Sequence, residues 1–203
     1  MANKNIKESY PVLRTSMESV PIQRLVTVLQ SGIFRSAIQG QTLLSFLSSL
    51  PGFTEDYIAN RLQTIFLDGD SVDDTSLVFS EASVTLALSA AMPGLAGALL
   101  RKSSPLTSLR KTAVQKQPSQ SSSPVVVKVK LFNVIAVEKG RELLAEGVLL
   151  KSEDLVSFLK LRPTLVEAMH ETTLNSEPIR TQELFANLER YPEIFLICNA
   201  DDV

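Results

Sequence analysis

Four aspartates, Asp68, Asp70, Asp73 and Asp74, lie within seven residues of the segment LDGDSVDD. Carboxylate oxygens at this density could bind Ca²⁺ or Mg²⁺, which prefer hard oxygen ligands. The EF-hand pattern is not met, because its sixth position would be Asp73, where that loop requires glycine. We therefore predict a solvated turn, and an enzyme or metal-binding protein with an acidic site is the alternative.

His170 and Cys198 are the only histidine and the only cysteine of the chain. Ser–His catalysis would have to use His170, but no nucleophile elbow, second histidine or phosphate-binding glycine pattern accompanies it. Cys198 belongs to the apolar run IFLICNA, where burial would raise the pKa of its thiol. We therefore predict a protein without enzymatic activity and without a cofactor.

A binding site is predicted in the segment MPGLAGALLRK, which combines glycines with two cations. Glycine permits close approach of the backbone, and the free amides at a helix start attract anions. The candidate binding residues are Pro93, Gly94, Leu95, Gly97, Arg101 and Lys102. A close-packed turn is the alternative interpretation of the same residues.

The segment 83–100, SVTLALSAAMPGLAGALL, has 18 residues without a charge, which approaches the length of a membrane span. Its serines and the Pro93-Gly94 break instead favour a strand, a turn and a helix of a soluble protein. Membrane association through this segment stays the second alternative.

The charges of the chain are unevenly distributed. No aspartate or glutamate occurs between Glu81 and Glu138, an interval that contains Arg101, Lys102, Arg110, Lys111, Lys116, Lys128 and Lys130. This pattern is typical of a solvated basic linker, or it serves an anionic partner: a membrane surface, an RNA or the chain's own acidic face. The net charge of -2 does not favour nucleic acid as the partner.

The elements that would position these residues fall into two parts, separated by SSPLTSLRKTAVQKQPSQSSSP. This tract is rich in serine, proline, glutamine and lysine and has few apolar residues. We expect a flexible N-terminus over 1–19, a first domain over 20–102, a linker over 103–124 and a second domain over 125–203.

Three short matches occur in the same order in the two parts. They pair 44–47 (LSFL) with 156–159 (VSFL), 67–72 (LDGDSV) with 174–179 (LNSEPI), and 84–90 (VTLALSA) with 194–200 (IFLICNA). Matches that keep their order predict an internal duplication.

Local patterns predict the elements. In the first part we expect a hairpin from 25–30 and 33–38, helices capped by Thr42 and Thr54, and strands over 64–67 and 84–88. In the second part we expect strands over 125–131 and 146–150 around a turn near Gly140, and a helix that starts at Ser152.

The order hairpin, helix, strand, turn and final strand resembles the β-grasp fold, and the segment QTIFLDGDSVDD is similar to ubiquitin-like proteins. The resemblance implies an interaction module, a sulfur carrier or a protein modifier. Carriers and modifiers of that superfamily end in Gly-Gly, whereas this chain ends NADDV, so conjugation is not carried over.

These patterns together predict an α+β protein with two small β-grasp-like units in tandem. Each unit would pack a mixed sheet on a helix, and the Ser/Pro-rich linker would join them. We expect a cytoplasmic, non-enzymatic interaction or scaffold protein with a protein partner, and homo-oligomerisation is an alternative.

Overall fold

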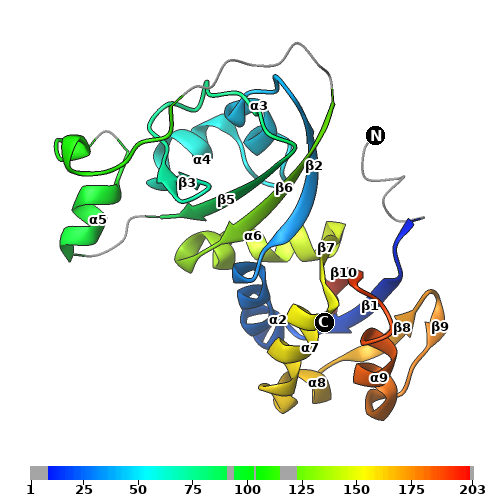
Figure 1. Ribbon diagram of the computed structural model, residues 1–203. Coiled ribbons are helices and arrows are strands. Elements are labelled where there is room, and N and C mark those ends of the chain that lie inside the picture. The colour runs from blue at the N-terminus through cyan, green and yellow to red at the C-terminus, as the bar shows by residue number, and fades with distance from the viewer. Residues whose placement is uncertain (1–8, 91–93, 103, 115–122, 202–203) are drawn as a thin grey trace. The chain divides into compact units, whose positions relative to one another are not determined.

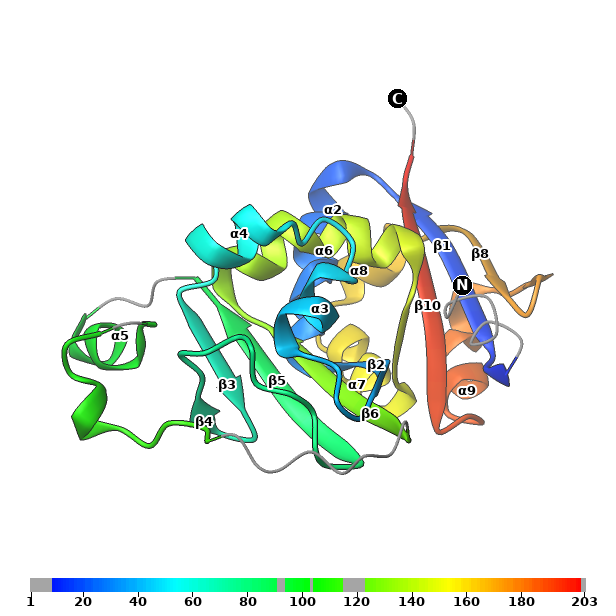
Figure 2. The same cartoon turned by 90° about the horizontal axis from the view of Figure 1, so that it is seen from above.

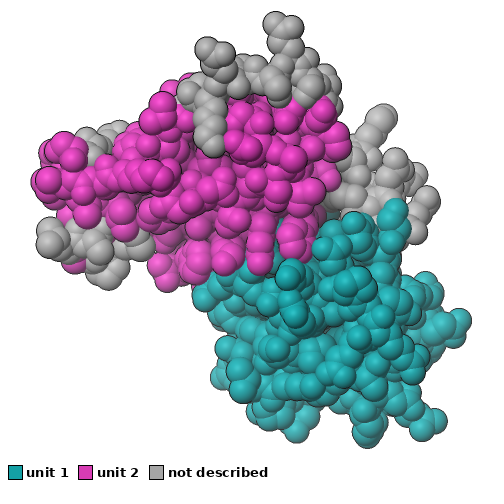
Figure 3. Space-filling model, in the orientation of Figure 1, with its two compact units in different colours: residues 1–33, 140–203 teal, residues 34–139 magenta. Residues whose placement is uncertain are grey.

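The computed structural model describes residues 9–90, 94–102, 104–114 and 123–201. It confirms a mixed α+β protein. The chain forms two compact units: residues 1–33 and 140–203 make up unit 1, and residues 34–139 make up unit 2 (Figure 3). The boundary between the units therefore falls once inside a strand, at 33/34, and once inside a helix, at 139/140. This division differs from the predicted sequence of domain, linker and domain.

Unit 2 contains a mixed sheet in the order β4-β3-β5-β6-β2. Its strands are β2 (Ile33–Ile38, whose first residue is counted with unit 1), β3 (Thr64–Leu67), β4 (Asp70–Ser71), β5 (Ser83–Ser89) and β6 (Pro124–Leu131). β3 is antiparallel to both β4 and β5, whereas β5 and β6 are parallel, with Ser83 opposite Val126.

Two short helices, α3 (Leu43–Ser48) and α4 (Glu55–Asn60), lie together on one side of the unit 2 sheet (Figures 1 and 2). As predicted, the hydroxyls of Thr42 and Thr54 cap them, each accepting a backbone amide at 3.1 Å. Phe46 of α3 is buried and makes an edge-to-face contact with Phe79 at 5.3 Å between ring centroids. Unit 2 also contains α5 (Gly94–Leu100) and the short turn η2 (Thr107–Leu109).

The strands of unit 1 are also mixed in direction and follow the order β7-β10-β1-β8-β9. Its strands are β1 (Val12–Met17), β7 (Val148–Lys151), β8 (His170–Leu174), β9 (Glu177–Pro178) and β10 (Glu193–Ala200). β1 and β10 are parallel, with Leu13 opposite Leu196, and each has an antiparallel neighbour on its other side. The helical elements are α2 (Ser19–Leu25), η1 (Val26–Gln30), α7 (Ser152–Lys160), α8 (Pro163–Glu167), η3 (Thr181–Glu183) and α9 (Leu184–Leu188).

One long helix, α6 (Asn133–Glu146), contains the boundary between the units at 139/140. Gly140 lies within this helix, so the predicted turn is wrong. A Cβ atom at Gly140 would lie 2.5 Å from Cβ of Val26, which shows that the glycine allows close packing on η1. The predicted strand over 25–30 is also wrong, because this segment is helical and buries Leu25, Val26 and Leu29 at helical spacing.

The same order of elements occurs twice along the chain. The first run is β1-α2-β2-α3-α4-β3-β4-β5, and the second is β6-α6-β7-α7-α8-β8-β9-β10, with α9 added before the last strand. We call residues 12–89 repeat 1 and residues 124–200 repeat 2. The three predicted matches lie on equivalent elements of these runs, namely α3 and α7, the β3 and β8 hairpins, and β5 and β10.

Each unit is built from both repeats. Unit 1 combines β1 and α2 of repeat 1 with β7 to β10 of repeat 2, and unit 2 combines β3 to β5 of repeat 1 with β6 of repeat 2. The first strand of each repeat therefore pairs in parallel with the last strand of the other. The strand orders of the two units differ in one respect, since β3 adjoins the last strand of its own repeat, whereas β8 adjoins β1, the first strand of the other repeat.

Within the part of the chain that the structure describes, no helix is both long and apolar enough to cross a membrane. The segment 83–100 forms β5 and α5, with residues 91–93 outside the described part. A strand followed by a helix is the local structure that the Pro93-Gly94 break predicted for this segment.

Candidate functional site

The side chains of β5 alternate between two faces of the unit 2 sheet. Val84, Leu86 and Leu88 are buried in the core, whereas Thr85 and Ala87 are partly exposed on the opposite face. β6 alternates in the same way, because Val127 and Val129 are fully buried and Lys128 and Lys130 are not. We call the less buried side of β2, β3, β5 and β6 the open sheet face.

A depression of about 510 Å³ lies on the open sheet face. Its lining residues come from β3, the β3–β4 turn, β5, β6 and the junction between β6 and α6: Phe66, Gly69, Thr85, Ala87, Ser89, Lys130, Phe132 and Asn133. We call it the sheet-face pocket. Its size falls in the range of ligand-binding clefts, and its combination of aromatic side chains with few polar groups is typical of them.

The polar end of the sheet-face pocket is fixed by the junction between β6 and α6. Asn133 has a left-handed φ of 52°, and its Nδ2 lies 3.2 Å from Oγ of Ser89. The amide of Phe132 donates to the carbonyl of Leu88 at 2.9 Å, which prolongs the β5–β6 ladder by one bond. Lys130 makes no ion pair or hydrogen bond with another described side chain, so its ammonium is available to a ligand.

The open sheet face continues beyond the pocket toward β2. Lys128 Nζ lies 5.8 Å from the ring centroid of Phe34, which places both side chains on this face. Val126 and Ile38 are 48% and 53% exposed. The sequences of β2, β5 and β6 contain no aspartate or glutamate, so the face combines apolar surface with positive charge.

The aspartates that sequence analysis proposed as a metal site each have a partner within the protein. Asp68 Oδ1 accepts the amide of Thr85 at 2.7 Å, and Asp74 accepts the amide and the hydroxyl of Ser76, which together lower the pKa of Asp74. Asp73 pairs with Arg110. The described residues contain no group of three or more side chains that could hold a metal ion.

Part of the basic interval binds the chain's own acidic residues, which was one of the predicted uses. Lys111 Nζ lies 2.8 Å from Asp70 Oδ2, and Arg110 pairs with Asp73. The backbone of this segment also pairs with β4, since the Ala113 amide donates to the Ser71 carbonyl at 2.8 Å. The segment 111–113 therefore covers the β4 edge of the unit 2 sheet.

The binding residues predicted around α5 are placed as follows. Pro93 lies outside the described residues; Gly94 and Leu95 begin the seven-residue α5; Gly97 is buried in it and Arg101 is exposed just after it. Lys102 Nζ donates to the carbonyl of Ile58 at 2.8 Å, and burial lowers the pKa of this ammonium. Anion binding by these residues stays a prediction, although Lys102 already serves a contact with the end of α4.

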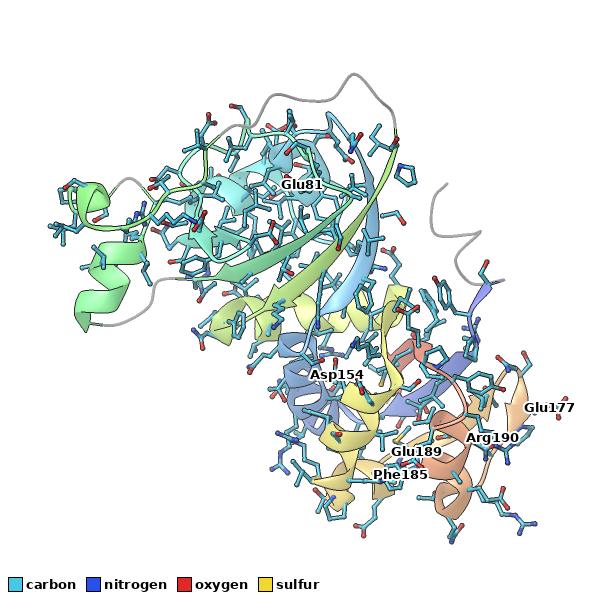
Figure 4. All side chains as sticks on the ribbon, in the orientation of Figure 1. Glu81, Asp154, Glu177, Phe185, Glu189 and Arg190 are labelled. Carbon is cyan, nitrogen blue, oxygen red and sulfur yellow. The ribbon has the colours of Figure 1, made fainter. Side chains whose placement is uncertain are left out.

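Unit 1 has a groove of about 360 Å³ formed by α7, α8, η3 and α9. Phe185 lies on α9 and Glu189 follows its last residue (Figure 4). Lys160 Nζ is 2.7 Å from Glu189 Oε1 and 5.6 Å from the Phe185 ring centroid. Because its cation is paired with a carboxylate, this groove attracts a charged ligand less strongly than the sheet-face pocket does.

A comparison with protein families, curated proteins and solved structures found no match for this chain. The site must therefore be interpreted from its own chemistry. His170 is exposed in β8, and Cys198 is 1% exposed in β10, where burial raises the pKa of its thiol to about 12. A buried neutral thiol is a poor nucleophile.

The sheet-face pocket was not predicted from the sequence, although one of its signals is visible there. The alternation in VVVKVKL predicted a strand with Lys128 and Lys130 on one face, which the structure confirms. Phe66 and Phe132 could not be added, because nothing local in the sequence shows that β3, β5 and β6 are neighbours.

Proposed function

We propose that the protein is a non-enzymatic binding protein that holds an acidic, partly apolar segment of a protein partner on the open sheet face of unit 2. The observation that carries the proposal is the joint position of Phe66, Phe132 and Lys130 around one pocket. Aromatic side chains are enriched in the cores of protein interfaces, and complementary charge selects and steers the partner.

Charge favours a protein partner over a nucleic acid. Lys128 and Lys130 are the only cations that β5 and β6 contribute, and the net charge of the chain is -2. Nucleic-acid binding depends on neutralising several phosphates, so a face with two lysines as the only charges of β5 and β6 suits a segment with a few carboxylates better.

We also propose that the two units are β-grasp-like and that the chain arose by internal duplication. The repeated element order and the mixed sheet of unit 2, with α3 and α4 on one side, support this interpretation. A cytoplasmic location is proposed on the single cysteine, because a chain of this length without a disulfide suits a reducing compartment.

The proposal is tested by NMR titration of the full chain with a short peptide in which glutamate alternates with leucine and phenylalanine. We expect the peptide to shift the amides of β5 and β6, and added salt to weaken binding. The double variant Lys128→Glu/Lys130→Glu should bind about tenfold more weakly or worse. Arg180→Glu is the control, because it reverses an exposed charge in unit 1, outside the open sheet face.

Two results would contradict the proposal. The first is that a peptide with lysine in place of every glutamate binds as tightly as the acidic peptide, which would show that charge does not select the ligand. The second is tight binding of oligouridine on the same face with no response to the acidic peptide, which would make the partner an RNA.

A further inference from the structure

Two parallel ladders join the repeats, and they are reciprocal. In unit 1, six residues of β1 pair with β10, from Val12 opposite Phe195 to Met17 opposite Ala200. In unit 2, six residues of β5 pair with β6, from Ser83 opposite Val126 to Leu88 opposite Leu131. In each unit, therefore, the first strand of one repeat pairs with the last strand of the other repeat.

The exchanged strands are central to their sheets and deeply buried. Leu13 and Met17 of β1 are 0% exposed, as are Val127 and Val129 of β6. A repeat separated from its partner would expose these apolar side chains and an unpaired strand edge in both units. The exposed apolar surface is costly, because burial of such surface is the dominant favourable term in folding, and the unpaired edge is a template for pairing with another chain.

We infer that the repeats are mutually completing halves, and that a second copy of this chain can supply the partner repeat. In the exchanged dimer, repeat 1 of each molecule pairs with repeat 2 of the other molecule through the same two ladders. The dimer therefore contains two complete sets of the contacts that one monomer makes. Exchange of identical elements is a low-cost route to dimers, since every contact of the monomer is kept.

The connection between β5 and β6 decides which form is made, because parallel neighbours cannot be joined by a tight turn. The register places Pro124 about eight residue rises, or roughly 26 Å, from the end of β5 at Ser89. In this chain, 34 residues, 90–123, separate Ser89 from Pro124. A four-residue link would reach only about 17 Å, so it could not return to the start of the neighbouring strand.

The test replaces 90–123 with a four-residue Gly-Ser link and measures the molar mass by light scattering after gel filtration. We expect a dimer of twice the mass of the parent chain. The matched control has a Gly-Ser link of the native length, which loses the same side-chain contacts but spans about 30 Å and should stay monomeric. A short-link variant that is folded and monomeric would overturn the inference.

A second measurement decides the matter if the short-link variant does not fold. A specific protease site is placed within 115–122 of the otherwise natural chain, and the folded protein is cleaved there. The two pieces should co-elute under native conditions and separate only in denaturant. Pieces that separate without denaturant would show that the ladders do not hold the repeats together, and would overturn the inference.

Discussion

Asp68 and Asn175 occupy equivalent positions at the tips of two hairpins, and each makes the same pair of hydrogen bonds. The Asp68 amide donates to the Thr85 carbonyl at 2.8 Å, and its Oδ1 accepts the Thr85 amide at 2.7 Å. The Asn175 amide donates to the Val12 carbonyl, and its Oδ1 accepts the Val12 amide, both at 2.9 Å. An aspartate and an asparagine thus serve one structural role.

This equivalence predicts that the oxygen of Asp68 matters and its charge does not. Asp68→Asn should retain the free energy of unfolding, whereas Asp68→Ala should lose about 1 kcal/mol with the hydrogen bond to Thr85. Urea unfolding of the two variants measures the difference. Two outcomes would show that the carboxylate has a role beyond the turn. Asp68→Asn could destabilise the protein as much as Asp68→Ala does, or it could abolish a stabilisation of the parent chain by Ca²⁺ or Mg²⁺.

The next residue of each turn predicts a stabilising change. Gly69 has a φ of 90°, and Ser176 holds a φ of 71°, which costs a residue with a Cβ atom. Ser176→Gly should therefore stabilise the protein by about 1 kcal/mol and raise Tm by about 2–4 °C. The reciprocal variant Gly69→Ser should lower Tm by a similar amount, and an unchanged Tm in both would contradict the assignment of strain.

Features with a local cause could be predicted from the sequence. The caps at Thr42 and Thr54 and the turn at Asp68 each depend on residues within a few positions of one another, so the pattern contains the whole signal. The strand with Lys128 and Lys130 on one face was predictable for the same reason.

Features with a distant cause could not be predicted. Val12 pairs with Phe195 and Ser83 with Val126, and no local pattern distinguishes a strand that pairs within its own half from one that is exchanged. The mistaken strand over 25–30 has a similar origin. Val26 and Val28 favour a strand locally, but packing of Val26 against Gly140 of α6 selects the helical form.

Gly147 should tolerate no side chain. It has a φ of 108°, and a Cβ atom there would collide with the ring of Phe195 and lie 3.0 Å from Ile197 Cγ1. Gly147→Ala should cost about 2–4 kcal/mol, because backbone strain and overpacking add. Gly40→Ala is the control, since Gly40 has a φ of 83° but no atom within 4 Å of the added Cβ. If chemical denaturation shows that Gly147→Ala and Gly40→Ala lose the same free energy of unfolding, the ring of Phe195 must move away from the added Cβ atom.

Cys198 should react with a thiol reagent only when the protein unfolds. Burial raises the pKa of its thiol to about 12 from 9.0, so the folded state keeps the proton that the unfolded state releases. Stability should therefore fall as pH rises above the unfolded value. Colour development with a disulfide reagent at pH 8 should be slow for the native chain and fast in urea, and rapid labelling of native protein would contradict the burial.

Glu138 should make the stability of unit 2 depend on pH in the acidic range. Arg61 Nε donates to Glu138 Oε1 at 2.9 Å and Tyr57 Oη donates to its Oε2 at 2.7 Å, which joins α4 of repeat 1 to α6 of repeat 2. The hydrogen bonds from Arg61 lead the causes that lower the pKa of Glu138 from 4.5, so the folded state holds the proton less tightly than the unfolded state. The stabilisation is therefore complete above pH 4.5 and is lost as pH falls through the lower folded value.

Two variants separate the contributions of this contact. Glu138→Gln should flatten the loss of stability below pH 4.5, and Tyr57→Phe should cost about 1 kcal/mol at neutral pH through one hydrogen bond. Glu153→Gln is the control, because Glu153 pairs with Lys151 while 72% exposed, and exposed pairs contribute little. Urea midpoints measured from pH 7 to pH 3 give the comparison, and parallel acid profiles for the parent and Glu138→Gln would show that α4 and α6 are held together by packing alone.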